Sequence, residues 1–237
     1  MTSGLLLRSL ACLIGIVLIA GISKFWTSAS PFGSRHIAAH PPTKNLFAVI
    51  VSGDGILTPL SDALCDGLAA HGIAVSQTRA LAYFWSRRSP EAMSTDLEHT
   101  LRHRLRTYPN DRFILIGYSF GAGTLPFAIN RLSGDLISRI DRVVLLAPPE
   151  DADFKFYFRS WINRASRDAY RTAPEIAMLA GVASVLYLRG RSDYPGPWSE
   201  LEGVDGIECV DLYGGHDFNK SYDQLVKLII KRDHFSR

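Results

Sequence analysis

Six short apolar runs alternate with helical patterns along this chain, and this alternation is what most constrains its fold. The runs are continuously apolar, as expected for strands that are covered on both faces. Strands separated by helices predict a parallel sheet with helices on each side. We therefore predict an α/β fold with a mostly parallel central sheet of about six strands, at residues 46–53, 72–81, 112–119, 142–149, 183–190 and 207–214.

Between these runs, apolar residues recur every three or four positions, the spacing of a helix that buries one face. Ser89 followed by Pro90 is a typical helix start, with a serine cap and a proline in the first turn. The expected helices are residues 59–71, 89–108, 121–132, 173–181 and 222–232.

Length and charge limit the classes of protein to which the chain can belong. Its 237 residues are 47% hydrophobic and 21% charged, enough apolar material for one sizeable α/β core. The formal net charge of +3 is too small to argue for a nucleic-acid partner.

The N-terminus has the pattern of a targeting segment. Residues 9–23 are uncharged and largely apolar, short for a membrane span and typical of a signal-peptide core. We expect residues 1–30 to be a signal peptide, with a retained membrane anchor as the alternative, and either reading predicts export to the periplasm. Residues 31–45 have prolines and no periodicity, which indicates a linker before a single domain at 46–237.

The two cysteines beyond this segment, Cys65 and Cys209, lie on a predicted helix and a predicted strand. Two such cysteines can pair in an oxidising compartment, but their places on different elements favour two separate buried thiols. No Cys/His cluster has the spacing of metal ligands, so we expect neither a metal nor an organic cofactor.

Residues 117–121 read Gly-Tyr-Ser-Phe-Gly and stand between an apolar strand and a helix. Two glycines around a serine permit the sharp strand-to-helix turn known as a nucleophile elbow. The motif therefore predicts that Ser119 is a catalytic nucleophile.

A serine nucleophile needs a histidine base and a carboxylate that orients the base. In the α/β-hydrolase fold these follow the serine in the order acid, then histidine. Asp193 and His216 each come just after a predicted strand, in that order. We predict the triad Ser119, Asp193 and His216, with Glu200 or Asp217 as alternatives for the acid.

An oxyanion hole requires two backbone N–H groups near the nucleophile. One is expected from Phe120, the residue after the serine. The other is expected from the loop after the first strand, near Asp54 or Gly55, although an ordinary Asp-Gly turn explains that loop equally well.

Several aromatic and basic side chains are candidates for substrate contacts. Residues 150–172 fall where hydrolases often insert a cap, and Arg164, Arg167 and Arg171 have the spacing of one helical face. Such a face would suit an anionic lipid surface or a substrate phosphate, and a solvated basic face is the alternative. The candidate substrate-binding residues are Tyr83, Trp85, Tyr118 and Arg164.

Five stretches together resemble the VirJ/AcvB family of bacterial virulence proteins. They read FAVIVSGDG, LAYFWSRRSPE, IGYSFGAGTLPFAINRL, LLAPPEDADFKFY and YGGHDFNKSYDQL, and they cover residues 46–230 in the expected order. The resemblance implies a periplasmic α/β-hydrolase-like domain linked to virulence and type IV secretion. It also implies lipase-like activity on aminoacylated phosphatidylglycerol, such as lysyl-phosphatidylglycerol, and it places the triad at Ser119, Asp193 and His216.

The chain departs from the family pattern at two places. Ile56 and Leu57 stand where a glycine and a tryptophan are usual, and Gly123 replaces an aspartate. If that aspartate binds the cationic aminoacyl group in the family, its absence here weighs against a preference for lysyl lipids. It does not weigh against ester hydrolysis. The chain also lacks the extra N-terminal domain of the longer family members, so it is similar to the short form.

These patterns predict an exported serine hydrolase that cleaves an ester, with a lipid or small ester as substrate and a membrane surface or secretion-system proteins as partners. The alternative is a non-catalytic periplasmic binding or assembly factor for a type IV secretion system that uses the hydrolase fold as a scaffold.

Overall fold

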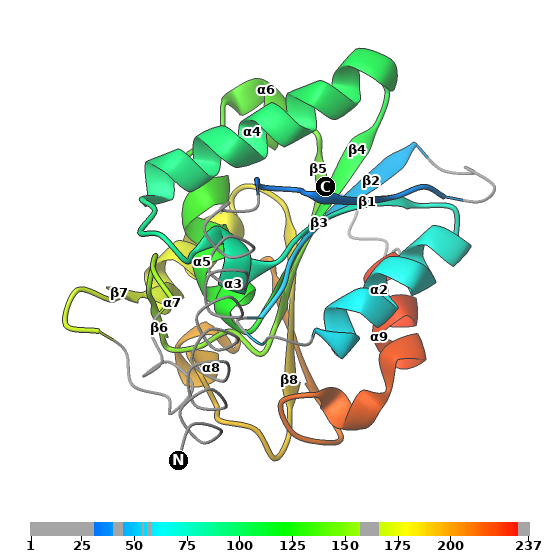
Figure 1. The fold of residues 1–237 in the computed structure, drawn as a ribbon. Helices are drawn as coiled ribbons and strands as arrows, with labels where there is room; N and C mark the ends of the chain where they lie inside the picture. Colours follow the sequence, from blue (N-terminus) through cyan, green and yellow to red (C-terminus); the bar gives the residue numbers. More distant parts are fainter. Residues whose placement is uncertain (1–30, 40–44, 54, 56–57, 157–165, 232–237) are drawn as a thin grey trace, which may run out of the picture.

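The computed structural model describes residues 31–39, 45–53, 55, 58–156 and 166–231. Within these ranges a seven-stranded sheet lies between two layers of helices (Figure 1). The strand order is β1-β3-β2-β4-β5-β8-β9, and neighbouring strands are parallel except at the β1–β3 pair. This architecture confirms the predicted α/β fold.

The elements have the following bounds. The strands of the sheet are β1 (Arg35–Ile37), β2 (Leu46–Val51), β3 (Ala74–Thr78), β4 (Arg112–Tyr118), β5 (Ile140–Leu146), β8 (Ser184–Gly190) and β9 (Ile207–Leu212). A separate antiparallel pair consists of β6 (Asp151–Ala152) and β7 (Tyr170–Arg171). The helices are α2 (Pro59–Ala70), α3 (Ala80–Tyr83), α4 (Pro90–Thr107), α5 (Phe120–Ile129), α6 (Gly134–Ile137), α7 (Thr172–Leu179), α8 (Trp198–Leu201) and α9 (Tyr222–Ile230), with a 3₁₀ turn η2 at Phe218–Lys220.

The six predicted strands correspond to β2, β3, β4, β5, β8 and β9, and the five predicted helices to α2, α4, α5, α7 and α9. The start of α4 follows the predicted chemistry, because the Ser89 hydroxyl accepts a hydrogen bond of 3.1 Å from the amide of Ala92. Pro90 follows in the first turn, where a missing N–H costs nothing.

The expected linker at 31–45 is corrected by the structure, because it contains the edge strand β1. The amide of Gly33 donates to the Thr78 hydroxyl at 2.7 Å, and the ring of Phe32 packs edge-on against Tyr83. Arg35 donates to the side chains of Asp62 and Gln77, at 2.8 Å each. These contacts hold a three-residue strand in place. The sequence of this strand has no apolar periodicity that would predict it.

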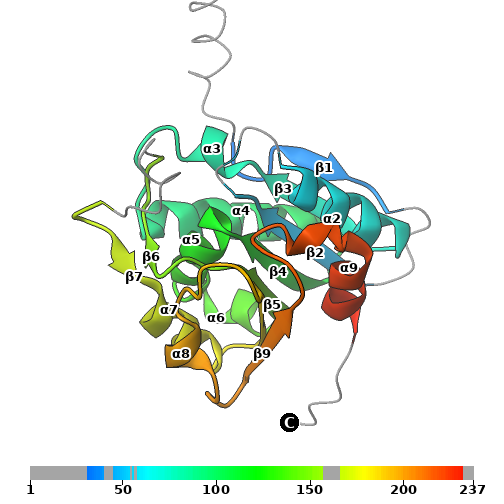
Figure 2. The same ribbon diagram turned by 90° about the horizontal axis from the view of Figure 1, so that it is seen from below.

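Two hydrophobic cores cover the two faces of the sheet, because successive strand residues point to opposite sides. On β2, Val49 faces a core that includes Leu97 of α4 and Leu125 of α5. The next residue, Ile50, faces a second core formed with α2 and α9. Figure 2 shows α2 and α9 together on one side of the sheet, and α5 and α7 on the other.

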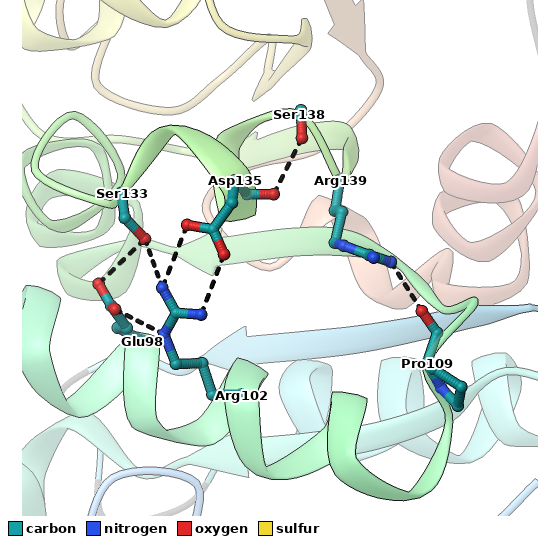
Figure 3. Close-up of polar contacts among 7 residues, drawn as sticks. All are labelled: Glu98, Arg102, Pro109, Ser133, Asp135, Ser138 and Arg139. Atoms are coloured by element: carbon teal, nitrogen blue, oxygen red, sulfur yellow. Dashed lines mark hydrogen bonds and ion pairs between the residues drawn. The ribbon is translucent and has the colours of Figure 1, made fainter.

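A polar network on the surface joins α4 to α6 (Figure 3). Arg102 of α4 donates to both carboxylate oxygens of Asp135, at 2.9 and 3.1 Å, and also to Ser133 and Glu98. A forked arginine–carboxylate contact is stronger than a single exposed ion pair, so this network fixes the turn before β5 against α4.

Cys65 and Cys209 are free thiols on separate elements, as predicted. Cys65 on α2 is buried, whereas Cys209 on β9 is only half-buried, which corrects the expectation that both are buried.

In the described ranges, the structure contains no helix with both the length and the apolar character needed to cross a membrane. The apolar segment at 9–23, and with it the expected signal peptide or anchor, lies outside those ranges.

Parallel strands bring their C-terminal ends to one edge of the sheet, where ligands bind in open α/β folds. The loops after β8 and β9 lie at the lower edge of the view in Figure 1. The turn after β4, which carries Ser119, belongs to the same edge because β4 runs parallel to both strands.

Candidate active site

The turn between β4 and α5 has the strained backbone of a nucleophile elbow. Ser119 has φ 52° and ψ −117°, a conformation that residues with a side chain rarely adopt. Such backbone outliers cost about 1–3 kcal/mol and persist where the surroundings enforce them. The amide of Ser119 donates to Leu146 of β5, and its carbonyl accepts from Gly123, which fixes the turn from both sides.

The two motif glycines are required by close backbone contacts. A Cβ on Gly117 would lie 2.6 Å from the Cα of Ala122. A Cβ on Gly121 would collide with the carbonyl oxygen of Val51 at the end of β2. The strand, the turn and α5 therefore approach one another as closely as backbones can.

The structure brings Ser119, His216 and Asp193 into hydrogen-bond contact. His216 Nε2 lies 2.8 Å from Ser119 Oγ, and His216 Nδ1 lies 2.8 Å from Asp193 Oδ2. The tautomer that satisfies both contacts has its proton on Nδ1, so that Nδ1 donates to the carboxylate and Nε2 accepts from the serine. The predicted contacts are thus present, while the catalytic roles stay predictions.

The alternative acids occupy other places. The Glu200 carboxylate accepts from Arg171 at 2.5 Å. The Asp217 carboxylate accepts from the amide of Asn219 at 3.1 Å and caps the η2 turn. Among the three carboxylates, Asp193 is the one that contacts the imidazole.

The acid and base loops are bound to each other. The amide of Ser192 donates to the carbonyl of Gly214 at 2.9 Å, and the amide of Tyr194 donates to Asp193 Oδ1 at 2.8 Å. Gly190 faces the carbonyl of Gly215 so closely that any side chain there would collide. The Asp193 side chain is only 12% exposed, whereas the His216 side chain is 49% exposed.

Phe120, one of the two expected donors of the oxyanion hole, lies at the start of α5. Phe120 is the first residue of α5, where a backbone N–H has no acceptor within the helix. Gly53 lies beside the nucleophile, since a Cβ on it would be 3.4 Å from the Cβ of Ser119. Asp54 lies outside the described residues, and Gly55 is described and half-buried. The loop after β2 is thus next to Ser119, as predicted.

Tyr118 contacts the candidate base, a role that the sequence did not indicate. Its hydroxyl donates to the carbonyl oxygen of His216 at 3.2 Å, and the two rings lie 5.3 Å apart between centroids. The two residues are 98 positions apart in the sequence. No local pattern signals such a contact.

Tyr83 is not a wall of a substrate site, which corrects that prediction. Its side chain is fully buried, and its hydroxyl donates to Asp96 at 2.6 Å. Burial raises the pKa of Tyr83 far above its usual range, with the Asp96 carboxylate adding to the effect. Trp85 is 39% exposed and stacks on Phe156, so it remains available at the surface.

The segment from 150 to 172 also differs from its prediction. Arg171 lies in strand β7 instead of on a helical face, and it pairs with Glu150 and Glu200. Arg167 lies in an exposed turn, and Arg164 lies outside the described residues. The prediction that the three arginines form a single basic helical face is therefore wrong.

The position of Gly123 leaves no room for a longer side chain. A Cβ on Gly123 would lie 2.8 Å from Cγ of Pro149 and 3.5 Å from the Cβ of Ala152. The aspartate expected from the family resemblance would not fit here unless Pro149 moved.

A cavity of about 230 Å³ opens near the start of α4. Its lining does not include Ser119, Asp193 or His216. Its walls carry charges of both signs, so they favour neither an anion nor a cation. The charged lining residues are Arg87, Arg88, Glu91, Arg131, Asp153, Lys155 and Asp168. No group of three or more His, Cys, Asp or Glu side chains suited to a metal ion occurs within the described ranges.

A serine that donates to a histidine, which in turn donates to a carboxylate, is the arrangement that activates a hydroxyl for nucleophilic attack. In serine hydrolases that use this arrangement, the histidine takes the hydroxyl proton during attack and returns it to the leaving group. Helix α5 begins directly after Ser119, and the N-terminus of a helix favours negative charge nearby.

Known proteins are similar to this chain at two levels. A family model described as bacterial virulence protein (VirJ) matches residues 45–235. No curated protein matches the sequence significantly.

Among solved structures, an alpha-beta serine hydrolase homologue from Coxiella burnetii has a TM-score of 0.56 and 17% identity, over 83% of this chain and 88% of its own. A serine hydrolase without lid from Xanthomonas campestris has a TM-score of 0.54 and 17% identity, over 82% and 84%. An esterase domain from Rhodothermus marinus has a TM-score of 0.59 and 12% identity, over 82% and 89%. These likenesses show the α/β-hydrolase fold.

Proposed function

This chain belongs to the VirJ family of bacterial virulence proteins, and we propose that it is a serine hydrolase that cleaves esters. The observation that carries the proposal is the placement of His216, whose ring nitrogens lie 2.8 Å from Ser119 Oγ and 2.8 Å from Asp193 Oδ2. The strained elbow at Ser119 supports it, because such strain concentrates at functional sites.

In the proposed reaction, Ser119 Oγ attacks the carbonyl carbon of the ester while its proton passes to His216 Nε2. Asp193 holds the Nδ1 proton and stabilises the imidazolium that forms. The amide of Phe120, with a second amide from the loop at Asp54 and Gly55, binds the oxyanion. The C–O bond to the alcohol breaks as that oxygen takes the proton from His216. Water then hydrolyses the acyl-enzyme by the same path. This chemistry uses no metal and no organic cofactor.

We further propose an ester of an aminoacylated phospholipid, such as lysyl-phosphatidylglycerol, as the natural substrate. This assignment rests on the family resemblance. Gly123 bears on it, because it supplies no carboxylate where the family usually has an aspartate, and a Cβ there would lie 2.8 Å from Cγ of Pro149. A lysyl group would then lack that partner, so we expect little discrimination between lysyl and neutral aminoacyl lipids.

Export to the periplasm completes the proposal, and the apolar residues 9–23 support it. In that compartment the enzyme would meet aminoacyl lipids at a membrane surface, and secretion-system proteins are further candidate partners.

The test is hydrolysis of three esters by the full chain and by Ser119→Ala. The esters are lysyl-phosphatidylglycerol, alanyl-phosphatidylglycerol and a soluble p-nitrophenyl ester. We expect the wild type to hydrolyse all three, and the variant to lose several orders of magnitude in rate while keeping its melting temperature. Equal rates for the two proteins would contradict the assignment of Ser119. A wild type inactive on every ester would favour a non-catalytic assembly factor.

A further inference from the structure

The imidazole of His216 is held by polar contacts more than by packing. Its side chain is 49% exposed, and Tyr213, three positions earlier in the same loop, is 79% exposed. A half-exposed ring can rotate away from its partners unless its backbone is fixed. The geometry of Ser119, His216 and Asp193 therefore depends on what holds the loop after β9.

On its C-terminal side, the loop after β9 has an unfavourable backbone conformation. Phe218, Asn219 and Lys220 all have positive φ, at 53°, 51° and 58°. Consecutive left-handed residues other than glycine are disfavoured by contacts of their Cβ atoms. The buried ring of Phe218 and the Asp217 cap on Asn219 hold this turn in place.

On its other side, the loop is held by Tyr118. The Tyr118 hydroxyl donates to the carbonyl oxygen of His216 at 3.2 Å, so the contact restrains the backbone of the base itself. The backbone of Tyr118 pairs with Leu146 of β5, in the middle of the sheet. Tyr118 thus connects the rigid strand that carries the nucleophile to the exposed loop that carries the base.

The ring of Tyr118 adds a second contact. It packs partly against the core on the α2 and α9 side, and its centroid lies 5.3 Å from that of His216 at an interplanar angle of 38°. An aromatic ring at this distance stabilises a neighbouring cation, which His216 becomes during attack.

We propose that Tyr118 is a positioning residue that holds His216 in register with Ser119, and that it is not a substrate contact. This inference rests on the proposed function. Catalysis is sensitive to displacements of about 1 Å, because attack requires a narrow range of distance and angle. Loss of the Tyr118 hydroxyl should therefore slow attack by Ser119 and leave substrate affinity unchanged.

The test compares Tyr118→Phe with Tyr213→Phe in the full chain, using a soluble p-nitrophenyl ester. Both variants lose only a hydroxyl, and Tyr213 is in the same loop and exposed to solvent. We expect Tyr118→Phe to lower kcat about 10- to 100-fold, with KM within about twofold of wild type. Tyr213→Phe should match wild type, and all three proteins should melt at the same temperature.

Tyr118→Leu removes the ring as well and should lower kcat further. A Tyr118→Phe variant with wild-type kcat and KM would overturn the proposal. An increase in KM at unchanged kcat would also overturn it, because it would identify Tyr118 as a substrate contact.

A second readout does not depend on turnover. The Nδ1 proton of His216, bound to Asp193, should give a downfield proton NMR signal in the wild type. We expect this signal to broaden in Tyr118→Phe, because the ring leaves the carboxylate more often, and to persist in Tyr213→Phe. A sharp, unchanged signal in Tyr118→Phe would contradict the proposal even if the wild type hydrolysed no ester, so the two proposals fail separately.

Discussion

Gly117 and Ala122 approach each other so closely that a Cβ on Gly117 would lie 2.6 Å from the Cα of Ala122. The end of β4 and the first turn of α5 are therefore in backbone contact across Ser119. This contact leaves the serine in a backbone conformation with φ 52°. The strain and the two glycines are parts of one arrangement that exposes the hydroxyl.

We predict that Gly117→Ala destabilises the protein by about 1–3 kcal/mol, because the added methyl group overpacks a backbone contact. Activity should fall as well, since relief of the clash moves Ser119. The matched control is Gly134→Ala on α6, where a Cβ would meet no atom within 4 Å. Denaturant unfolding of both variants measures the difference. An unfolding free energy of Gly117→Ala equal to that of Gly134→Ala would refute the packing argument.

The identity of the acid gives a second prediction. Asp193→Asn should lower kcat about 10⁴-fold, because an amide favours the wrong tautomer of His216. Glu200→Gln is the control, since Glu200 contacts Arg171 and not the imidazole. Steady-state kinetics on a soluble ester checks both variants. A larger loss in Glu200→Gln than in Asp193→Asn would show that the acid is misassigned.

The buried strands and the main helices of this fold are predictable from sequence, because each is encoded by the pattern of its own neighbouring residues. The run from 46 to 53 is apolar without a break, and the structure buries all of Leu46–Val51. The chain order of Ser119, Asp193 and His216 was sufficient to expect their contact, because parallel strands end at one edge of the sheet. Ser89 and Pro90 predicted where helix α4 begins.

The remaining features depend on contacts between distant residues. Tyr83 and Trp85 are two positions apart, yet one is fully buried and the other 39% exposed, because the direction of each side chain depends on the short helix α3. Arg171 has helical spacing in the sequence but lies in β7 opposite Asp151 of β6, and its side chain pairs with Glu150. Strand β1 depends on partners in β3 and α2 that lie 27 to 45 residues away.

The docking of residues 31–39 gives a third prediction. A chain that starts at residue 40 loses the contact of Phe32 with Tyr83 and the bond from Gly33 to Thr78, unlike a chain that starts at residue 31. We expect the shorter chain to melt about 5–10 °C lower, since a few kcal/mol of burial and hydrogen bonding is lost. Thermal unfolding of the two truncations provides the measurement. Equal melting temperatures would restore these residues to the role of a linker.

Thiol reactivity gives a fourth prediction. Burial raises the pKa of Cys65 to about 12, so almost none of it is thiolate at pH 8. We expect a water-soluble maleimide to leave Cys65 unmodified in the native protein and to modify it after unfolding. Cys209, which is half-buried, is the internal comparison and should react sooner. Peptide mapping follows both sites, and rapid native labelling of Cys65 would show that α2 is not packed as described.

The central claim is that His216 activates Ser119, and covalent labelling by a fluorophosphonate tests it most directly. The reagent reacts with serines that are activated as nucleophiles and not with ordinary serines. Intact-protein and peptide mass spectrometry of the wild type should show one adduct, located on Ser119. Ser119→Ala should show none, and His216→Ala should react far more slowly. An unlabelled wild type, or equal labelling of wild type and His216→Ala, would contradict the account.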